Sequence, residues 1–194
     1  MNILQKFLGH IKTVSVHRFW VFYFCCKAGI PIRGLFHDLS KFSPTEFFES
    51  VRYYQGTSSP IDACKKDKGY SRAWLHHKGR NPHHYEFWQD NFDNGGTPLK
   101  MPYKYAVEMV CDYLAAGKAY MGKNFTYEAE YEWWKIKKSK TLAMNEHTKE
   151  FIDDMLKMMA SRNSCIFLKR SLSLQVYKEV EQKISLRNKK AAEK

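Results

Sequence analysis

The sequence predicts an all-α protein, folded as a compact single-domain helical bundle. Apolar residues recur at helical spacing in several long segments, and glycine or proline separates these segments. No segment shows the alternation of apolar and polar residues that is typical of a half-buried strand. A length of 194 residues suits one domain, and 44% hydrophobic with 27% charged residues is typical of a folded globular chain.

The first helix is expected over residues 2–28, because Gly29 and Pro31 end its periodic pattern. Ser43 is expected to cap a later helix that opens at Pro44, with Glu46 closing a capping box. Polar loops are expected at residues 56–69 and 93–102. The remaining helices are expected at residues 32–39, 44–54, 71–77, 83–89, 103–120, 127–138, 145–161 and 165–188.

Residues 1–122 are expected to form the functional core. Residues 123–194 are expected to pack on it as C-terminal helices with a basic tail, the whole forming one domain. The formal net charge is +12, and four lysines gather within residues 135–140. A basic surface suits a phosphate-bearing ligand or nucleic acid, although a solvated helix face and tail explain it more simply. No named nucleic-acid motif is present, so a nucleic-acid contact stays the weaker alternative.

The five cysteines indicate reduced thiols. Their number is odd, no CxxC is present and no signal peptide is evident, so a cytoplasmic location is expected. The apolar run at residues 21–26 is too short to span a bilayer, and Arg18 and Lys27 flank it. No transmembrane segment and no membrane partner are therefore expected.

Histidines form the most unusual pattern in the chain. His37 and Asp38 stand side by side, and two further pairs, His76-His77 and His83-His84, flank a Gly-Arg-Asn-Pro turn. Neutral imidazole and carboxylate are ordinary ligands of transition metals. A single pair is more often a packing or surface feature, but three such doublets together favour a metal site over aromatic-like packing in a Trp-rich core.

The helix at residues 103–120 adds two acidic residues. Glu108 and Asp112 are four apart and share a face, and Asp112 lies beside an apolar stripe. A carboxylate at such a place needs a partner, which a metal ion or a lysine would supply. A pair of exposed acids is the alternative interpretation.

His17, the His37-Asp38 doublet and Asp112 follow one another in the order of the HD superfamily, which this chain resembles over roughly residues 10–115. That superfamily consists of all-α metal-dependent proteins, mostly phosphohydrolases acting on nucleotides. The His-Asp-Leu-Ser-Lys segment is similar to the HDxxK of many members and implies that Lys41 lies near the metal. The segments around the doublet, the two histidine pairs and Glu108 to Asp112 also resemble an uncharacterised family of bacteria and phages.

The resemblance implies a site of one or two divalent ions of Mn, Fe, Zn or Ni. The implied ligands of the first ion are His17, His37, Asp38 and Asp112. HD proteins with extra histidines often hold a second ion, bridged by the doublet aspartate. His77 and His84 are expected to bind it, with His76 and His83 as alternates or as groups that support the ligands. The choice within each pair stays open, because adjacent residues point about 100° apart on a helix.

The predicted function is hydrolysis of a nucleotide or other phosphate ester by metal-activated water. The expected partner is a small anionic substrate, with no particular oligomeric state indicated. Lys41 would offset phosphate charge, with Lys78 or Arg80 as further possibilities, and His83, Glu108 or Glu46 would serve as the general acid. The aromatic rings at positions 74, 85 and 88 suit base stacking, although core packing is their commoner use. The alternatives are an HD-type di-iron oxygenase and a non-catalytic nucleotide-binding protein.

Overall fold

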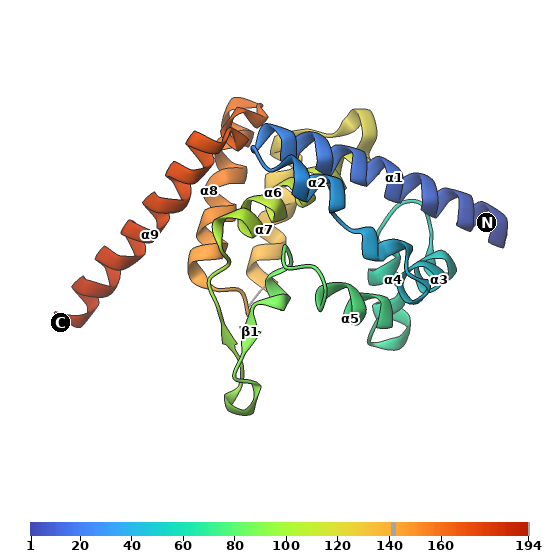
Figure 1. Ribbon diagram of the computed structural model, residues 1–194, viewed down its shortest axis with the longest axis horizontal. Helices are drawn as coiled ribbons and strands as arrows, with labels where there is room; N and C mark the ends of the chain where they lie inside the picture. Colours follow the sequence, from blue (N-terminus) through green and yellow to red (C-terminus); the bar gives the residue numbers. More distant parts are fainter. Residues whose placement is uncertain (141–142, 194) are drawn as a thin grey trace.

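Two long helices, α1 (Ile3–Lys27) and α6 (Tyr103–Met121), pack against each other and form the axis of the fold. The computed structural model describes residues 1–140 and 143–193 (Figure 1). Asn2 begins α1 through a complete capping box with Gln5. The other α-helices within the described residues are α2 (Pro31–Phe36), α3 (Pro44–Tyr53), α4 (Pro60–Lys68), α5 (Arg72–Lys78), α7 (Tyr127–Lys140), α8 (Glu146–Arg162) and α9 (Arg170–Ala192).

The remaining helices flank this axis on two sides. The short helices α3, α4 and α5 pack on one another beside the N-terminal half of α1, whereas α7, α8 and α9 lie at the other side of the molecule (Figure 1). The second half of α9 extends away from the body. Short 3-10 helices connect these elements: η1 (Leu39–Phe42), η2 (Tyr85–Phe87), η3 (Phe92–Asn94), η4 (Gly122–Asn124) and η5 (Cys165–Leu168).

The hydrophobic core lies around α6. Buried side chains from α1, α6, α7, α8 and α9 belong to one cluster, with Trp134 and Phe151 among its fully buried members. This cluster contains residues from both sides of position 122. The all-α single-domain class is thus confirmed, while the separate role assigned to residues 123–194 stays a prediction. None of the described helices is both long and apolar enough to cross a membrane.

The expected helix at residues 32–39 is wrong in its second half. α2 ends at Phe36, and His37 and Asp38 form a turn before η1. Asp38 adopts the left-handed conformation with φ 55°. A regular helix would point the two side chains about 100° apart. The turn instead allows them to converge.

Three further differences concern short elements. Residues 56–69 contain α4 instead of a loop, because Pro60 opens a helix that Gly69 ends with φ 79°. Residues 83–89 do not form an α-helix: η2 is followed by β1 (Gln89–Asp90), which pairs antiparallel with β2 (Thr97–Pro98). The expectation of no strand is therefore also wrong at this small hairpin. The last expected helix, at residues 165–188, is divided into η5 and α9.

The predicted cap of α3 is half right. Ser43 Oγ accepts a hydrogen bond from the Glu46 amide at 3.4 Å, and Pro44 occupies the first turn. The Glu46 side chain does not complete a capping box. Its buried carboxylate turns to the histidines of α5 instead, which gives it a place in the functional site.

Candidate metal centre

The centre is built around Asp38, which is buried in the turn between α2 and η1. The His37-Asp38 turn lies against the inner faces of α1 and α6. Arg18 of α1 holds it by donating hydrogen bonds to the carbonyl oxygens of Leu35 and His37, at 2.9 and 3.0 Å. Aspartate is among the few residues that tolerate a left-handed backbone. The chain therefore accepts an uncommon conformation at the residue that lies at the centre of the cluster.

The first ligand group is a set of four side chains that could together hold a metal ion: His17 from α1, His37, Asp38 and Asp112 from α6. His17 Nε2 lies 3.1 Å from Asp112 Oδ1 and 3.6 Å from Asp38 Oδ2. His37 Nε2 lies 3.3 Å from Asp38 Oδ2 and 3.4 Å from Asp112 Oδ1. Four side chains from three separate segments thus direct donor atoms at one point, as the resemblance to the HD superfamily implies.

The second ligand group consists of Asp38, His77 from α5, and both His83 and His84. The Nε2 atoms of His77 and His83 each lie 3.3 Å from Asp38 Oδ1. The His84 ring packs against that of His77, with ring centroids 4.8 Å apart. The structure brings both predicted histidines, His77 and His84, to this group. It adds His83, which was predicted as an alternate and as a general acid.

The spacing of these atoms suits a metal ion. An ion about 2.0–2.2 Å from each ligand separates neighbouring ligand atoms by roughly 3.0 Å in octahedral or 3.4 Å in tetrahedral geometry. The distances above fall at these values. Within the described residues, Asp38 Oδ1 and the Nε2 atoms of His17, His37, His83 and His84 are buried and make no hydrogen bond. Burying five polar atoms without a hydrogen bond is costly, and metal ions would satisfy them.

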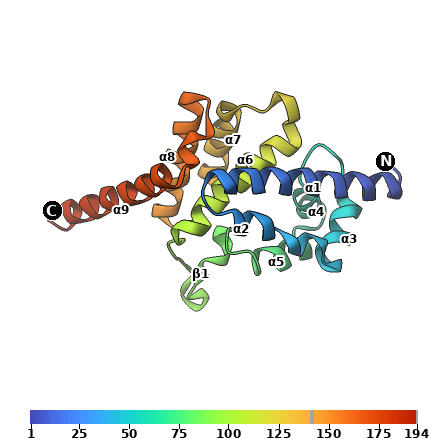
Figure 2. The ribbon, with the colours of Figure 1, turned by 45° about the horizontal axis from the view of Figure 1, so that its top comes forward.

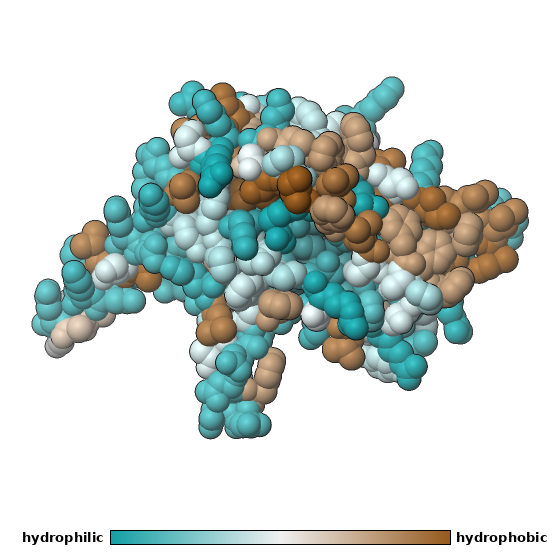
Figure 3. All heavy atoms as spheres, viewed as in Figure 1, coloured by the Kyte–Doolittle hydropathy of each residue, from teal (hydrophilic) through white to brown (hydrophobic). Residues whose placement is uncertain are grey.

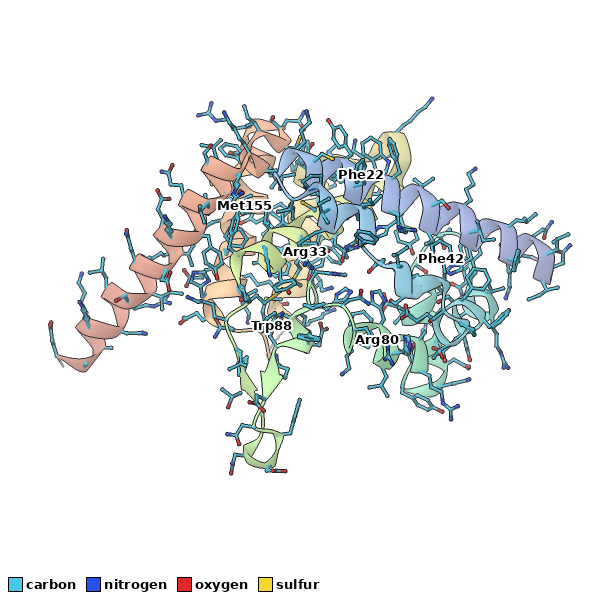
Figure 4. All side chains as sticks on the ribbon, viewed as in Figure 1. Phe22, Arg33, Phe42, Arg80, Trp88 and Met155 are labelled. Atoms are coloured by element: carbon cyan, nitrogen blue, oxygen red, sulfur yellow. The ribbon has the colours of Figure 1, made fainter. Side chains whose placement is uncertain are left out.

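Two glutamates support one histidine in each group. Glu108 Oε1 lies 3.0 Å from His37 Nδ1, and its other oxygen accepts a 2.5 Å hydrogen bond from Arg33. Arg33 of α2 lies beside α6 (Figure 4). Its guanidinium carbon lies 4.2 Å from the ring centroid of Tyr105. Glu46 Oε2 lies 2.7 Å from His77 Nδ1 in the same way. A carboxylate at Nδ1 directs Nε2 toward a metal and raises its basicity.

The remaining carboxylate contacts refine this assignment. Glu108, His37 and His83 also have the spacing of a three-ligand group, with Glu108 Oε1 3.6 Å from His83 Nδ1. Glu108 already pairs with His37 and Arg33, so its geometry suits orienting the histidine ligand. His76 is absent from every ligand group of the described residues, and its Nδ1 lies 2.6 Å from Glu46 Oε1.

Lys41 lies at the edge of the centre, as predicted. Its Nζ is 2.5 Å from Asp38 Oδ2. Burial disfavours its charge, but the negative charges of Asp38 and Asp112 prevail and raise the pKa of Lys41. Burial likewise favours protonated Asp38, but His37, Lys41 and His77 hold the pKa of its carboxyl well below the usual range. Asp38 is therefore an anion and can act as a ligand at any ordinary pH.

The histidines divide by charge. Burial lowers the pKa of His83 and, more strongly, that of His84, and neighbouring histidines add to the effect. Burial acts the same way on His77 but is outweighed by Asp38 and Glu46, which raise its pKa to about 9. Asp38 similarly raises the pKa of His37 well above its ordinary value. His83 and His84 are thus neutral and could bind metal directly, whereas His37 and His77 would first have to release a proton.

Besides His76, two further histidines lie outside the ligand groups and have other surroundings. His10 packs against Phe47 and Tyr54, and His147 Nε2 lies 3.0 Å from the carbonyl oxygen of Tyr177.

The sequence predicted Glu46 only as part of a helix cap and as a possible general acid, and it did not predict the contact of Glu46 with His77. The sequence around Glu46 gave no signal of this role, because the contact between Glu46 and His77 forms between two helices, α3 and α5.

The architecture is thus a buried cluster of histidines and carboxylates that could hold metal at two adjacent places sharing Asp38. No curated protein and no solved structure matches the chain. Residues 6–158 match a family of unknown function, DUF5662, and every residue of both ligand groups lies within that range. The chain therefore belongs to the DUF5662 family.

Proposed function

We propose that the protein is a metal-dependent phosphohydrolase that holds two divalent transition-metal ions and acts on a nucleotide or another phosphate ester. The observation that carries this proposal is the division of Asp38 between the two groups. Its Oδ2 faces His17 and His37, and its Oδ1 faces His77 and His83. A carboxylate shared in this way suits a two-ion site, the arrangement that many phosphoryl-transfer enzymes use.

The proposal includes a distant relationship to the HD superfamily. The order of His17, the His37-Asp38 doublet and Asp112 suggested it, and the convergence of these four side chains supports it. The all-α fold is also the one that the relationship requires. A match of this chain to the HD superfamily itself would be the direct test, and the proposed chemistry can be tested without it.

In this proposal each side chain has one task. Metal ions in such a site polarise phosphoryl oxygens and lower the pKa of bound water to about 7. The ions are held by Asp38, Asp112 and the five histidines of the two ligand groups, which are His17, His37, His77, His83 and His84. Glu108 and Glu46 orient His37 and His77, and Lys41 offsets negative charge on the substrate. His83 serves as a ligand in this assignment, so its predicted role as general acid becomes secondary.

A di-iron oxygenase is the second candidate. The three histidines of the second group favour it, because imidazole with carboxylate suits iron as well as manganese. Metal identity separates the two: iron with an absorbance change on exposure to oxygen supports the oxygenase, and metal-dependent phosphate release supports the hydrolase. A binding protein without turnover would instead retain a phosphate-bearing ligand unchanged through purification.

The test combines metal content with turnover. We expect about two ions per chain by inductively coupled plasma mass spectrometry, and release of phosphate from at least one member of a nucleotide panel. Asp38→Asn should abolish both. Asp93→Asn, an exposed aspartate in the hairpin, is the matched control and should change neither. Phosphatase activity that survives in Asp38→Asn would overturn the proposal.

A further inference from the structure

The outer face of α1 is unusually apolar. Figure 2 shows α1 in front of the other elements with its outer side uncovered, and Figure 3 shows hydrophobic residues gathered over the region of α1 and α2. The inner side of the same helix carries His17 and the buried core residues. Helix α1 therefore has two apolar faces, of which the described residues of this chain cover only one. The outer stripe consists of Leu4, Leu8, Ile11, Ser15, Phe19, Phe22 and Cys26.

The stripe is symmetrical about Ser15. Its other members lie four, seven and eleven residues away in both directions, so at about 100° per residue all seven share one face of the helix. An antiparallel copy of α1 would therefore place Ser15 opposite itself on a two-fold axis. Ile11 would then face Phe19, and Leu8 would face Phe22. A self-complementary surface is what an isologous dimer requires.

The neighbouring surface extends this symmetry. Ile32, Leu35 and Phe36 of α2 are exposed beside the C-terminal half of α1, where Gly34 packs against Phe22 and Cys25. The N-terminal half of α1 exposes Ile3, Leu4 and Phe7. Antiparallel pairing brings the N-terminal half of one copy to the C-terminal half and α2 of the other. Each exposed apolar group then meets an exposed apolar group.

The area is sufficient for a stable interface. The side chains are 36–69% exposed, and a Phe or Leu side chain presents on the order of 150–200 Å² when fully exposed, so they offer roughly 800 Å² together. A standard interface buries about 800 Å² on each partner. The side chains counted are Ile3, Leu4, Phe7, Leu8, Phe19, Phe22, Ile32, Leu35 and Phe36.

The charge distribution permits the same occupant, because none of the seven residues of the stripe is charged. Residues 1–45 contain a single acidic residue, Asp38, and it is buried, so this face offers no carboxylate to a basic partner. Lys12 is the exposed lysine at the margin of the stripe. Antiparallel pairing would place the two copies of Lys12 about 9 Å apart along the helix axis, close to the screening length in physiological salt. Contact between the two apolar stripes therefore brings no like charges together.

We propose that the outer face of α1, with the exposed side of α2, binds a second copy of this chain in an antiparallel two-fold dimer centred on Ser15. This inference is independent of the proposed hydrolase activity, because it rests on the face of α1 opposite to His17. Since both copies carry a net charge of +12, the dimer should tighten as salt rises and screens their repulsion. Attachment to an anionic membrane or nucleic acid would weaken under the same change.

The first experiment is sedimentation velocity on the full chain across protein and salt concentrations. The wild type should sediment as a dimer, and Ser15→Arg should raise the dimer dissociation constant at least about 100-fold by placing two like charges on the axis. Ser185→Arg on α9 changes another exposed helical serine in the same way and should remain dimeric. Circular dichroism checks that both variants keep their helical content, since both positions are exposed.

The second experiment tests the register. Ser15→Cys in a Cys26→Ser background should form an intermolecular disulfide under mild oxidation. Lys12→Cys in the same background should not, because its mate lies beyond the reach of a disulfide. A wild type that stays monomeric at about 100 µM would overturn the proposal. So would a dimer that Ser15→Arg leaves intact, or vesicle binding that occurs through this face in place of self-association.

Discussion

The two ligand groups share Asp38 but are positioned by different kinds of structure. In the first group, His17 and Asp112 come from α1 and α6, the long helices that pack together at the centre of the fold. In the second, His83 and His84 lie in an irregular segment between α5 and η2. The packing of the hydrophobic core therefore also holds the first group in place, whereas the second group depends on contacts within the irregular segment. We therefore expect the second ion to be the one that a chelator removes first.

The strongest test of this comparison removes one histidine from each group. His17→Ala and His84→Ala should each lower the metal content from about two ions to one, and the hydrolysis rate by on the order of 10³-fold. The ion that remains should resist chelation in His84→Ala and be lost readily in His17→Ala. Metal analysis after timed dialysis against a chelator measures both. Two ions retained in His84→Ala would show that the second group is not a metal site.

Substitutions of Glu46 and Glu108 should affect the two groups separately, with smaller effects than loss of a histidine. Glu46→Gln should lower the affinity for the second ion by about 10–100-fold, and Glu108→Gln should lower the affinity for the first ion by a similar factor. In each variant, a histidine loses the carboxylate at its Nδ1. Competition with a fluorescent chelator measures both constants. Glu128→Gln serves as the matched control, since Glu128 is an exposed glutamate on α7 and belongs to neither group. Equal weakening of both ions by Glu46→Gln would contradict the assignment.

The side-chain pKa distinguishes His77 from His84 within the second group, because it is raised in His77 and lowered in His84. The raised pKa of His77, about 9, means that its ring is protonated at neutral pH in the metal-free protein. Binding must displace this proton, so affinity should rise up to tenfold per pH unit until about pH 9. The proton stabilises the metal-free fold below pH 6.5, and that stability is lost as pH rises through about 9. Calorimetry in buffers of different ionisation enthalpy counts the released protons, and His77→Gln should release fewer.

The smallest expected effect concerns the hydrogen bonds that hold His77. Asn81 Nδ2 donates to Ser40 Oγ at 2.9 Å and to the His77 carbonyl oxygen at 2.8 Å. Losing the two bonds costs about 1–2 kcal/mol, so Asn81→Ala should lower the affinity for the second ion by about 5–30-fold. The affinity of the first ion should not change, and the same competition assay checks this. A larger effect on the first ion would mean that Asn81 acts through Asp38.

Two members of the first group, His17 and Asp112, lie on helices that the sequence predicts, but it was the resemblance to the HD superfamily that linked them to His37 and Asp38. His17 and Asp112 lie on inward faces whose periodicity is visible in the sequence, and both appear in the cluster where they were expected. The helices themselves were predicted for the same reason. Helix α4 was missed although Pro60 and Gly69 mark its ends, because its polar composition resembles that of a loop.

The second group could be predicted only in part. Two adjacent histidines point apart on a regular helix, which favoured choosing one from each pair. The segment after Pro82 is not helical, and both His83 and His84 reach the site. The partners of Glu46 were equally hidden, because they arise from the packing of α3 on α5. Contacts between separate elements leave no periodic signal in either one.

The left-handed backbone at Asp38 limits which substitutions the turn can accept. At φ 55° a β-branched or bulky side chain would strain the chain, whereas asparagine adopts this conformation readily. Asp38→Asn should therefore keep the loop in place while removing the charge shared by both groups. Loss of metal from a variant whose turn keeps its shape can then be assigned to the missing charge, which makes Asp38→Asn a clean probe of that single carboxylate.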